Sequence, residues 1–215
     1  MYRSFVVVDD FYPDPHAVRR AALALAYPEV DGTRTFPGRT SAGKIEPPQF
    51  DAIASQLVGE RVVGHQRPTA FHCHFRITLA GEAGRYHAHV DPSGLAWVGV
   101  VYLSLPEHCL GGTVFYRHRG LGLDRTPNDQ ADLASQGVGT IAELLQRDGP
   151  NPDAWEETMS LAMRFNRAVF YRPWLWHSAG PGFGAQADDS RLVQLLAFVY
   201  PPKAPIPRSG AGEGT

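Results

Sequence analysis

The sequence predicts a mainly β protein with flanking helices, of the α+β class, built as a β-rich barrel rather than a helical bundle. The 18 prolines and 22 glycines among 215 residues imply many turns and short elements. From Phe71 to Leu79 the odd-numbered residues are apolar and most even-numbered ones are polar, as in a strand with one apolar face. Other runs typical of strands cover residues 5–8, 97–105, 113–116, 168–171 and 191–200, and we expect a short strand at 86–91.

Helices are predicted on either side of this strand-rich region. Asp14 and Pro15 form an N-cap followed by proline at the first helical position, and apolar residues then recur at helical spacing, which predicts a helix over 15–27. We expect a long loop over 28–50 and a second helix near 49–58. Two more helices are predicted at 134–146 and 152–163, the latter capped by Asn151. These two would form a helical insertion at about 120–165.

The length favours one domain over residues 1–200, followed by a tail at 201–215 whose composition predicts disorder. Only two cysteines are present, Cys73 and Cys109, which are too few for a disulfide framework, so we interpret both as free thiols.

The charge pattern argues against two classes of partner. The net charge is -2 with no concentrated basic stretch, so we expect no nucleic-acid partner. The apolar run Phe5–Val8 is too short for a signal peptide or a membrane span, so we expect a cytoplasmic protein without a membrane partner. The remaining expectation is a small-molecule or peptide substrate.

The histidine pattern indicates a metal site. In the run His87-Ala-His89-Val-Asp91, positions 89 and 91 would project from the same face of a strand. Two imidazoles and one carboxylate on one face of an octahedron are typical of non-haem Fe(II) oxygenases. His177 is the best third ligand, because it ends a strand-like run and precedes a Gly/Pro stretch. On its own, a His-x-Asp pair is a common surface turn, and His87 is more simply read as a polar contact at the barrel rim.

Five short motifs then follow in one order. They are Tyr86-x-x-His89-x-Asp91, Val101-Tyr102-Leu103-Ser104, Gly111-Gly112-Thr113-x-Phe115, His177, and Arg191-x-Val193. In this order the sequence resembles the Fe(II)/2-oxoglutarate-dependent dioxygenase superfamily, particularly small bacterial members of its prolyl-hydroxylase-like branch. The resemblance covers roughly residues 71–116 and 168–200. It implies a double-stranded β-helix, which is a jelly-roll barrel, with the helical stretch as an insertion.

The resemblance also implies a cofactor and a reaction. His89, Asp91 and His177 would bind Fe(II), with 2-oxoglutarate and O2 as co-substrates. The reaction would release succinate and CO2 and oxidise an unactivated C–H bond. Halogenating relatives replace the carboxylate ligand with a small residue, so the presence of Asp91 favours hydroxylation.

Three further residues are expected to hold 2-oxoglutarate. Arg191 would form a bidentate pair with the distal carboxylate, Tyr102 would add a hydroxyl donor, and Tyr86 sits where this branch often contacts the co-substrate. Arg191 lies 14 residues after His177, which predicts a small extra loop at 182–189.

Several alternatives stay open at this point. A cupin-type metal protein that does not use 2-oxoglutarate would share the barrel and the His-x-His element. A binding module without activity and a zinc hydrolase are weaker alternatives.

The polar face carrying His72, His74 and Arg76 is expected to face the substrate cleft, where Arg76 would meet an anionic group. The insertion would either cover the mouth of the barrel or pack as a buttress.

Overall fold

A computed structural model describes residues 3–29, 36–67 and 71–202. Within them, the strands are β1 (Phe5–Val8), β2 (Arg39–Lys44), β3 (Val63–Gly64), β4 (His74–Thr78), β5 (Trp97–Tyr102), β6 (Gly112–His118), β7 (Trp155–Ala162), β8 (Ala168–Tyr171), β9 (His177–Ser178) and β10 (Arg191–Val199). The helices are α1 (Pro15–Leu23), α2 (Phe50–Val58), α3 (Gln130–Ser135) and α4 (Ile141–Asp148), with short 3-10 turns at Pro106–His108 and Pro152–Ala154.

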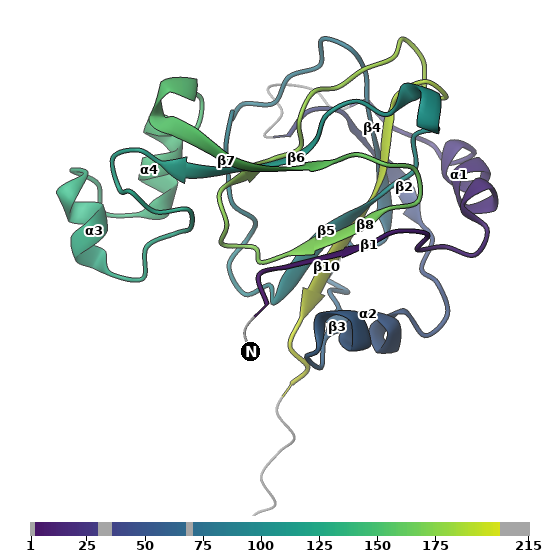
Figure 1. The fold of residues 1–215 in the computed structure, drawn as a ribbon, viewed down its shortest axis with the longest axis horizontal. Coiled ribbons are helices and arrows are strands. Elements are labelled where there is room, and N and C mark those ends of the chain that lie inside the picture. Colours follow the sequence, from purple (N-terminus) through teal and green to yellow (C-terminus); the bar gives the residue numbers. More distant parts are fainter. Residues whose placement is uncertain (1–2, 30–35, 68–70, 203–215) are drawn as a thin grey trace, which may run out of the picture.

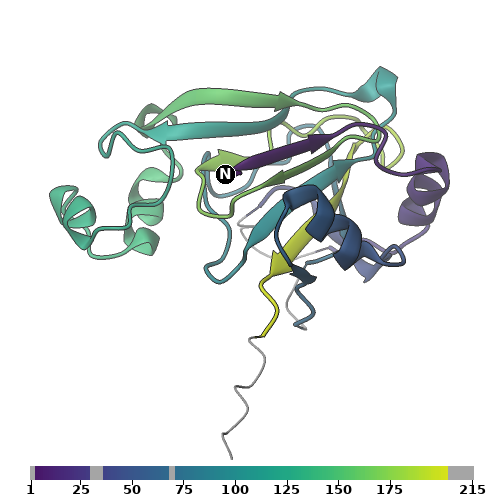
Figure 2. The same cartoon turned by 60° about the horizontal axis from the view of Figure 1, so that its bottom comes forward.

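The strands form two antiparallel sheets. The larger has the order β1-β8-β5-β10-β4-β2, with β3 also paired to β10, and the smaller has the order β7-β6-β9. The smaller sheet lies across the larger one, α1 and α2 lie on the far side of the larger sheet, and α3 and α4 project from one end (Figures 1 and 2). This arrangement confirms the predicted mainly β fold with flanking helices, a double-stranded β-helix.

Most of the predicted elements are confirmed with small changes of bounds. Strands occur at all five main predicted runs, and the helix expected near 49–58 is α2. The first helix begins where its cap predicts, because an Asp14 carboxylate oxygen accepts a hydrogen bond from the Ala17 amide at 2.9 Å. It ends at Leu23 rather than at residue 27.

The central strand β10 is buried on both faces and contributes to two of the three hydrophobic cores formed by the described residues. Leu192, Leu196 and Phe198 belong to the outer core, between the larger sheet and helices α1 and α2. Val193 and Leu195 belong to the inner core, between the two sheets. Burying each such side chain contributes about 1.5–3 kcal/mol, so the sheet is held from both sides.

The helix predicted at 152–163 is wrong. Asn151 does cap a turn, since its side-chain oxygen accepts from the Asp153 amide at 3.1 Å, but that turn is the 3-10 segment Pro152–Ala154. The chain then becomes strand β7, which pairs antiparallel with β6 over its whole length. The free backbone groups on the edge of β6 need a partner, and this requirement overrides the helix-favouring glutamates of the segment.

Two other local predictions are corrected. The stretch 134–146 is not one helix, because α3 ends at Ser135 and α4 begins after the Thr140 cap, whose hydroxyl accepts from the Glu143 amide at 3.1 Å. The expected loop at 28–50 contains β2, which pairs with β4 through Thr40 opposite Arg76.

The alternation along β4 is confirmed from Phe75 to Thr78 and fails before it. Phe75 and Ile77 face the outer core, and Arg76 faces the barrel interior. Cys73 adopts the left-handed φ of 61°, which interrupts the strand geometry. His72 therefore turns away from the predicted cleft and stacks on Phe50 in the outer core, with ring centroids 5.8 Å apart.

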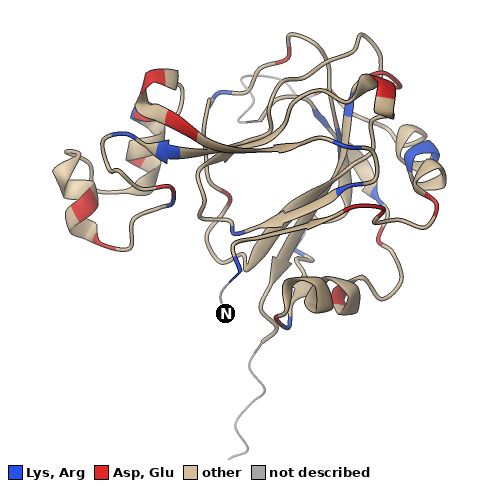
Figure 3. Cartoon of the chain, viewed as in Figure 1, with Lys and Arg blue, Asp and Glu red and all other residues tan. Residues whose placement is uncertain are grey.

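The described residues contain no helix long and apolar enough to cross a membrane. Lys and Arg are interspersed with Asp and Glu along the drawn chain (Figure 3). The predicted tail is described only at Pro201 and Pro202, and residues 203–215 lie outside the described residues.

Candidate metal site and adjoining cavity

His89, Asp91 and His177 come together between the two sheets. One ligand atom from each lies within 4.8 Å of the other two. The predicted strand at 86–91 does not form. Instead His89 makes a single antiparallel bridge to His177 of β9, with amide-to-carbonyl hydrogen bonds of 3.0 and 2.9 Å. The Asp91 amide donates to the Pro173 carbonyl at 3.0 Å, so backbone bonds hold both segments in register.

The protonation states suit a metal. His177 Nδ1 lies 2.9 Å from the Leu175 carbonyl oxygen, which can only accept, so Nδ1 carries the proton and Nε2 keeps its lone pair. That Nε2 lies 3.3 Å from Asp91 Oδ2. Burial, followed by the nearby His177 and Arg76, holds the pKa of His89 well below its usual value, so its imidazole is neutral. Two imidazole nitrogens and a carboxylate are a donor set that fits Fe(II).

Aromatic rings shield these residues. The Phe36 ring lies 4.6 Å from the His89 ring, and the Tyr171 ring lies 4.7 Å from the His177 ring, measured between centroids. Sequence reasoning predicted residue 171 only as part of a strand and missed its place at the site. Burial, with Asp91 second, raises the pKa of Tyr171 well above its usual value, so the phenol stays protonated.

A cavity of about 80 Å³ opens beside the three candidate ligands. Most of its wall is apolar, with Val98, Val100 and Leu195 among its members. Arg191 also lines it and is only 2% exposed. The Arg191 Nε makes no hydrogen bond to any described residue, so a buried cation faces the cavity without a carboxylate partner among them. Such a group requires an anion, because an unpaired buried charge is strongly unfavourable.

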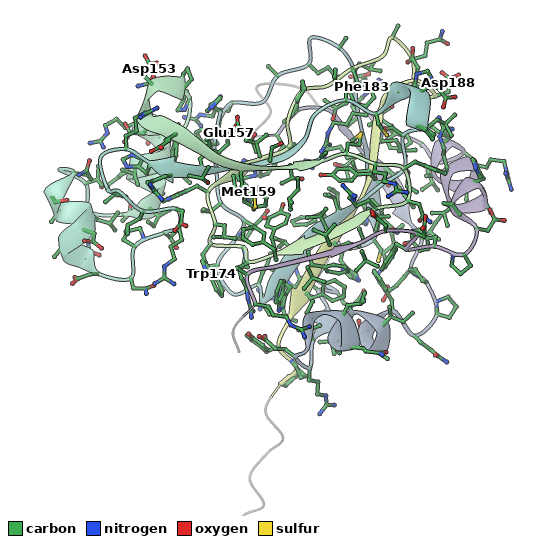
Figure 4. The ribbon with its side chains drawn as sticks, viewed as in Figure 1. Asp153, Glu157, Met159, Trp174, Phe183 and Asp188 are labelled. Carbon is green, nitrogen blue, oxygen red and sulfur yellow. The ribbon has the colours of Figure 1, made fainter. Side chains whose placement is uncertain are left out.

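Residues 182–189 form a loop before Arg191, as predicted. Phe183 and Asp188 lie in it, between β9 and β10 (Figure 4). Phe183 is buried in the inner core, and the Asp188 carbonyl accepts a hydrogen bond from Arg19 of α1. The loop is therefore anchored at Phe183 and at Asp188. The spacing of 14 residues between His177 and Arg191 does not displace Arg191 from the cavity.

Tyr102 stands behind the cavity wall. Its hydroxyl lies 2.7 Å from Thr113 Oγ1, and Thr113 itself lines the cavity. The Arg191 guanidinium carbon is 6.0 Å from the centre of the Tyr102 ring. Burial raises the pKa of Tyr102, so its hydroxyl remains a donor. Thr113 was recognised only as part of a motif, and no pattern in the sequence singled out its hydroxyl.

Tyr86 lies elsewhere. With His87 it lines a groove of about 560 Å³ between segments 82–87 and 178–182. Its ring lies 5.3 Å from the Arg85 guanidinium carbon. The groove shares Phe36 and His89 with the cavity, so it adjoins the metal site, but Tyr86 does not line the cavity that contains Arg191.

The end of helix α4 supports the segment that carries His89 and Asp91. The Gly149 carbonyl, at the end of α4, accepts from the amides of His87 and Ala88 at 2.7 and 3.3 Å. Asp148 accepts a hydrogen bond from His118 of β6 at 2.9 Å, which fixes α4 to the smaller sheet. The His87–Asp91 segment is thus positioned from behind.

Several known structures resemble this chain at low sequence identity. AviO1 from Streptomyces viridochromogenes Tue57 is 13% identical over 95% of this chain and 94% of its own, with a TM-score of 0.51. The non-heme alpha ketoglutarate dependent epimerase SnoN from nogalamycin biosynthesis is 16% identical over 97% of this chain and 87% of its own, with a TM-score of 0.49. A Pseudomonas putida prolyl-4-hydroxylase is 16% identical over 93% of this chain and 94% of its own, with a TM-score of 0.45.

At 13% identity, the similarity to AviO1 supports the fold and says nothing about function. No curated protein has a similar sequence. Residues 2–189 match the family described as "Family of unknown function (DUF6445)", and the chain therefore belongs to that family.

Proposed function

We propose that this protein is an Fe(II)- and 2-oxoglutarate-dependent oxygenase that hydroxylates an unactivated C–H bond of a small molecule, amino acid or peptide. One observation carries the proposal. A single cavity is lined both by two imidazoles and a carboxylate and by a buried guanidinium whose Nε has no partner among the described residues. A metal alone would explain the first group, whereas a bound co-substrate with a distal carboxylate explains both.

Each residue then has a distinct task. His89, Asp91 and His177 would hold Fe(II), and Arg191 would bind the distal carboxylate of 2-oxoglutarate. Tyr102 fixes the hydroxyl of Thr113, which faces the cavity beside Arg191. When bound, iron with 2-oxoglutarate and O2 supplies an oxidant that can break a C–H bond, with succinate and CO2 as products.

The surroundings support oxidation chemistry. Val98, Val100 and Leu195 keep water away from the reacting centre, which protects a reactive oxidant from side reactions. The groove of about 560 Å³ meets the cavity at Phe36 and His89, so it offers a substrate a path to the metal. The retained carboxylate of Asp91 favours hydroxylation over halogenation, as the family resemblance implies.

The test is co-substrate binding followed by turnover. Anaerobic protein loaded with Fe(II) should bind 2-oxoglutarate with a new visible absorption band, and admission of O2 should release succinate slowly even without a substrate. His177→Ala is the matched control and should show neither signal. A cupin-type dioxygenase would form no such complex. The absence of both the band and succinate would therefore refute the proposal in favour of that alternative.

A further inference from the structure

A second arginine faces the same cavity and has no role in the proposed chemistry. Arg76 of β4 lines the cavity together with Arg191 of β10, and among the described lining residues Asp91 is the single carboxylate. The two arginines lie on paired strands, with Arg76 opposite Val193 and Arg191 opposite Thr78. Side chains at such diagonal positions are near neighbours, so two like charges are held close together.

The Arg76 guanidinium is only partly satisfied. Its Nε and Nη2 donate to Thr40 Oγ1 at 3.2 and 3.1 Å, and Nη1 donates to no described residue. Burial, with Arg191 second, lowers the pKa of Arg76 to about 10, so the side chain is still a cation at neutral pH. The hydroxyl of Thr40 fixes one edge of the guanidinium and leaves the Nη1 end free.

The position of Arg76 points toward the groove. Its guanidinium carbon lies 5.3 Å from the centre of the Phe36 ring, and Phe36 packs on His89. Phe36 lines both the cavity and the groove of about 560 Å³. A molecule that lies in the groove and reaches the metal would pass this ring. Arg76 lies on the cavity side of the ring, because it lines the cavity and not the groove.

The charges at the site leave one cation over. A divalent metal with Arg76 and Arg191 outweighs Asp91 by three charges, and a 2-oxoglutarate dianion removes two of them. One carboxylate of that dianion would go to the metal and the other to Arg191. Arg76 would remain unmatched in a largely apolar cavity, which is unfavourable unless an anion joins it.

We infer that the substrate carries a carboxylate and that Arg76 binds it by an end-on pair of hydrogen bonds. The inference rests on the proposed function, because Arg76 is assigned to the substrate only if Arg191 holds the co-substrate. A planar guanidinium fits a carboxylate with two parallel bonds, whereas a neutral amide of the same shape offers one acceptor. The substrate class is therefore a carboxylic acid small enough to extend its acid group past Phe36, such as an amino acid.

The experiment uses the full chain with Fe(II) and 2-oxoglutarate. The probes are the standard amino acids, their N-acetyl derivatives, the matching primary amides and O-phospho amino acids. At least one carboxylate should raise succinate release at least tenfold over the basal rate, and its amide should not. In Arg76→Gln this stimulation should be lost, with 2-oxoglutarate affinity changed less than about twofold. Arg76→Lys should recover part of it. Arg164→Gln, which removes an exposed arginine paired with Asp9 at 3.0 Å, is the charge control and should behave as the unaltered protein.

The outcomes separate the two proposals. If no metal and 2-oxoglutarate complex forms in the unaltered protein, both proposals fail. If the complex forms but Arg76→Gln weakens 2-oxoglutarate as strongly as Arg191→Gln, Arg76 belongs to the co-substrate site and the inference is wrong. Amides that stimulate as well as acids, phosphates that alone stimulate, or a panel in which no carboxylate acts would also overturn it.

Discussion

Two groups of side chains in this protein have the spacing of a metal site, and they differ in protonation. His89, Asp91 and His177 form one group, and Glu46, His72 and Cys73 form the other. In each group the ligand atoms lie within 4.8 Å of one another. Distance alone therefore does not distinguish them.

The backbone group opposite Nδ1 makes the difference. His177 Nδ1 faces the Leu175 carbonyl and must donate, which leaves Nε2 free to bind a metal. His72 Nδ1 accepts from the Ala197 amide at 3.1 Å, so the neutral ring carries its proton on Nε2 and has no lone pair there. Burial also raises the pKa of Cys73 to about 12, which keeps the thiol protonated. Only the first group is prepared for a metal.

The largest expected effect concerns metal stoichiometry. We predict one Fe(II) per chain, and His89→Ala, Asp91→Ala or His177→Ala should each weaken binding beyond detection at micromolar protein, because each removes one of three ligands. His72→Gln should leave the stoichiometry unchanged. Anaerobic titration with equilibrium dialysis measures both.

Two results would contradict this difference in metal binding between the two groups. A second metal equivalent that vanishes in His72→Gln would show that the ring can exchange its backbone bond for a metal. Retention of stoichiometric iron in all three single variants of the first group would remove the proposed site.

The next effect compares two buried nitrogens that make no hydrogen bond to any described residue, Arg191 Nε at the cavity and His72 Nε2 in the second group. Arg191 faces a cavity, so Arg191→Gln should weaken 2-oxoglutarate by about 3 kcal/mol, roughly a hundredfold, because a buried carboxylate loses its cation. His72 faces Glu46 at 4.0 Å, and His72→Gln should not change co-substrate affinity. Isothermal titration under anaerobic conditions compares them. An unchanged affinity in Arg191→Gln would transfer the co-substrate role to Arg76.

The contrast between the two groups also shows what the sequence could predict. The three candidate ligands of the first group were predicted from spacing and motif order, and the structure brings them together although the strand predicted at 86–91 does not form. The position of His72 was not predicted, because a left-handed φ of 61° at a cysteine has no signal in the sequence. One residue with this φ moves the side chains that precede it in the predicted strand to the opposite face of the sheet.

Long-range pairing explains the other differences. Segment 155–162 contains residues that favour a helix, and only the neighbouring β6 makes it a strand. Tyr171 reaches the site because β8 lies between β1 and β5 in the sheet, an order that the sequence does not reveal. Strand runs such as 5–8 and 191–200 were predicted correctly because their apolar content suffices to define them.

An intermediate effect concerns pH and belongs to the second group. Burial lowers the pKa of His72 from its ordinary 6.5 to about 4, so the native state binds fewer protons than the unfolded state between these values. Stability from this residue is therefore fully present above pH 6.5 and is lost as the pH falls toward 4. We predict a loss on the order of 2 kcal/mol over this window that is absent in His72→Gln. Urea denaturation at pH 7 and pH 4.5 measures it. Equal pH dependence in both proteins would mean that the ring is protonated in the native state.

The smallest expected effect tests whether Glu46 is a ligand or a surface group. Its carboxylate is paired with Lys44 at 3.0 Å and its side chain is 31% exposed, and such pairs contribute about 0–1 kcal/mol. Glu46→Gln should therefore lower the melting temperature by a few degrees at most.

The informative measurement adds Zn²⁺ to His177→Ala, in which the first group is disabled. Because His72 offers no lone pair and Cys73 no thiolate, Zn²⁺ should leave the melting temperature of that variant unchanged. A zinc-dependent rise that disappears in the double variant His177→Ala/Glu46→Gln would show that spacing, rather than the proton on the ring, decides which group binds a metal.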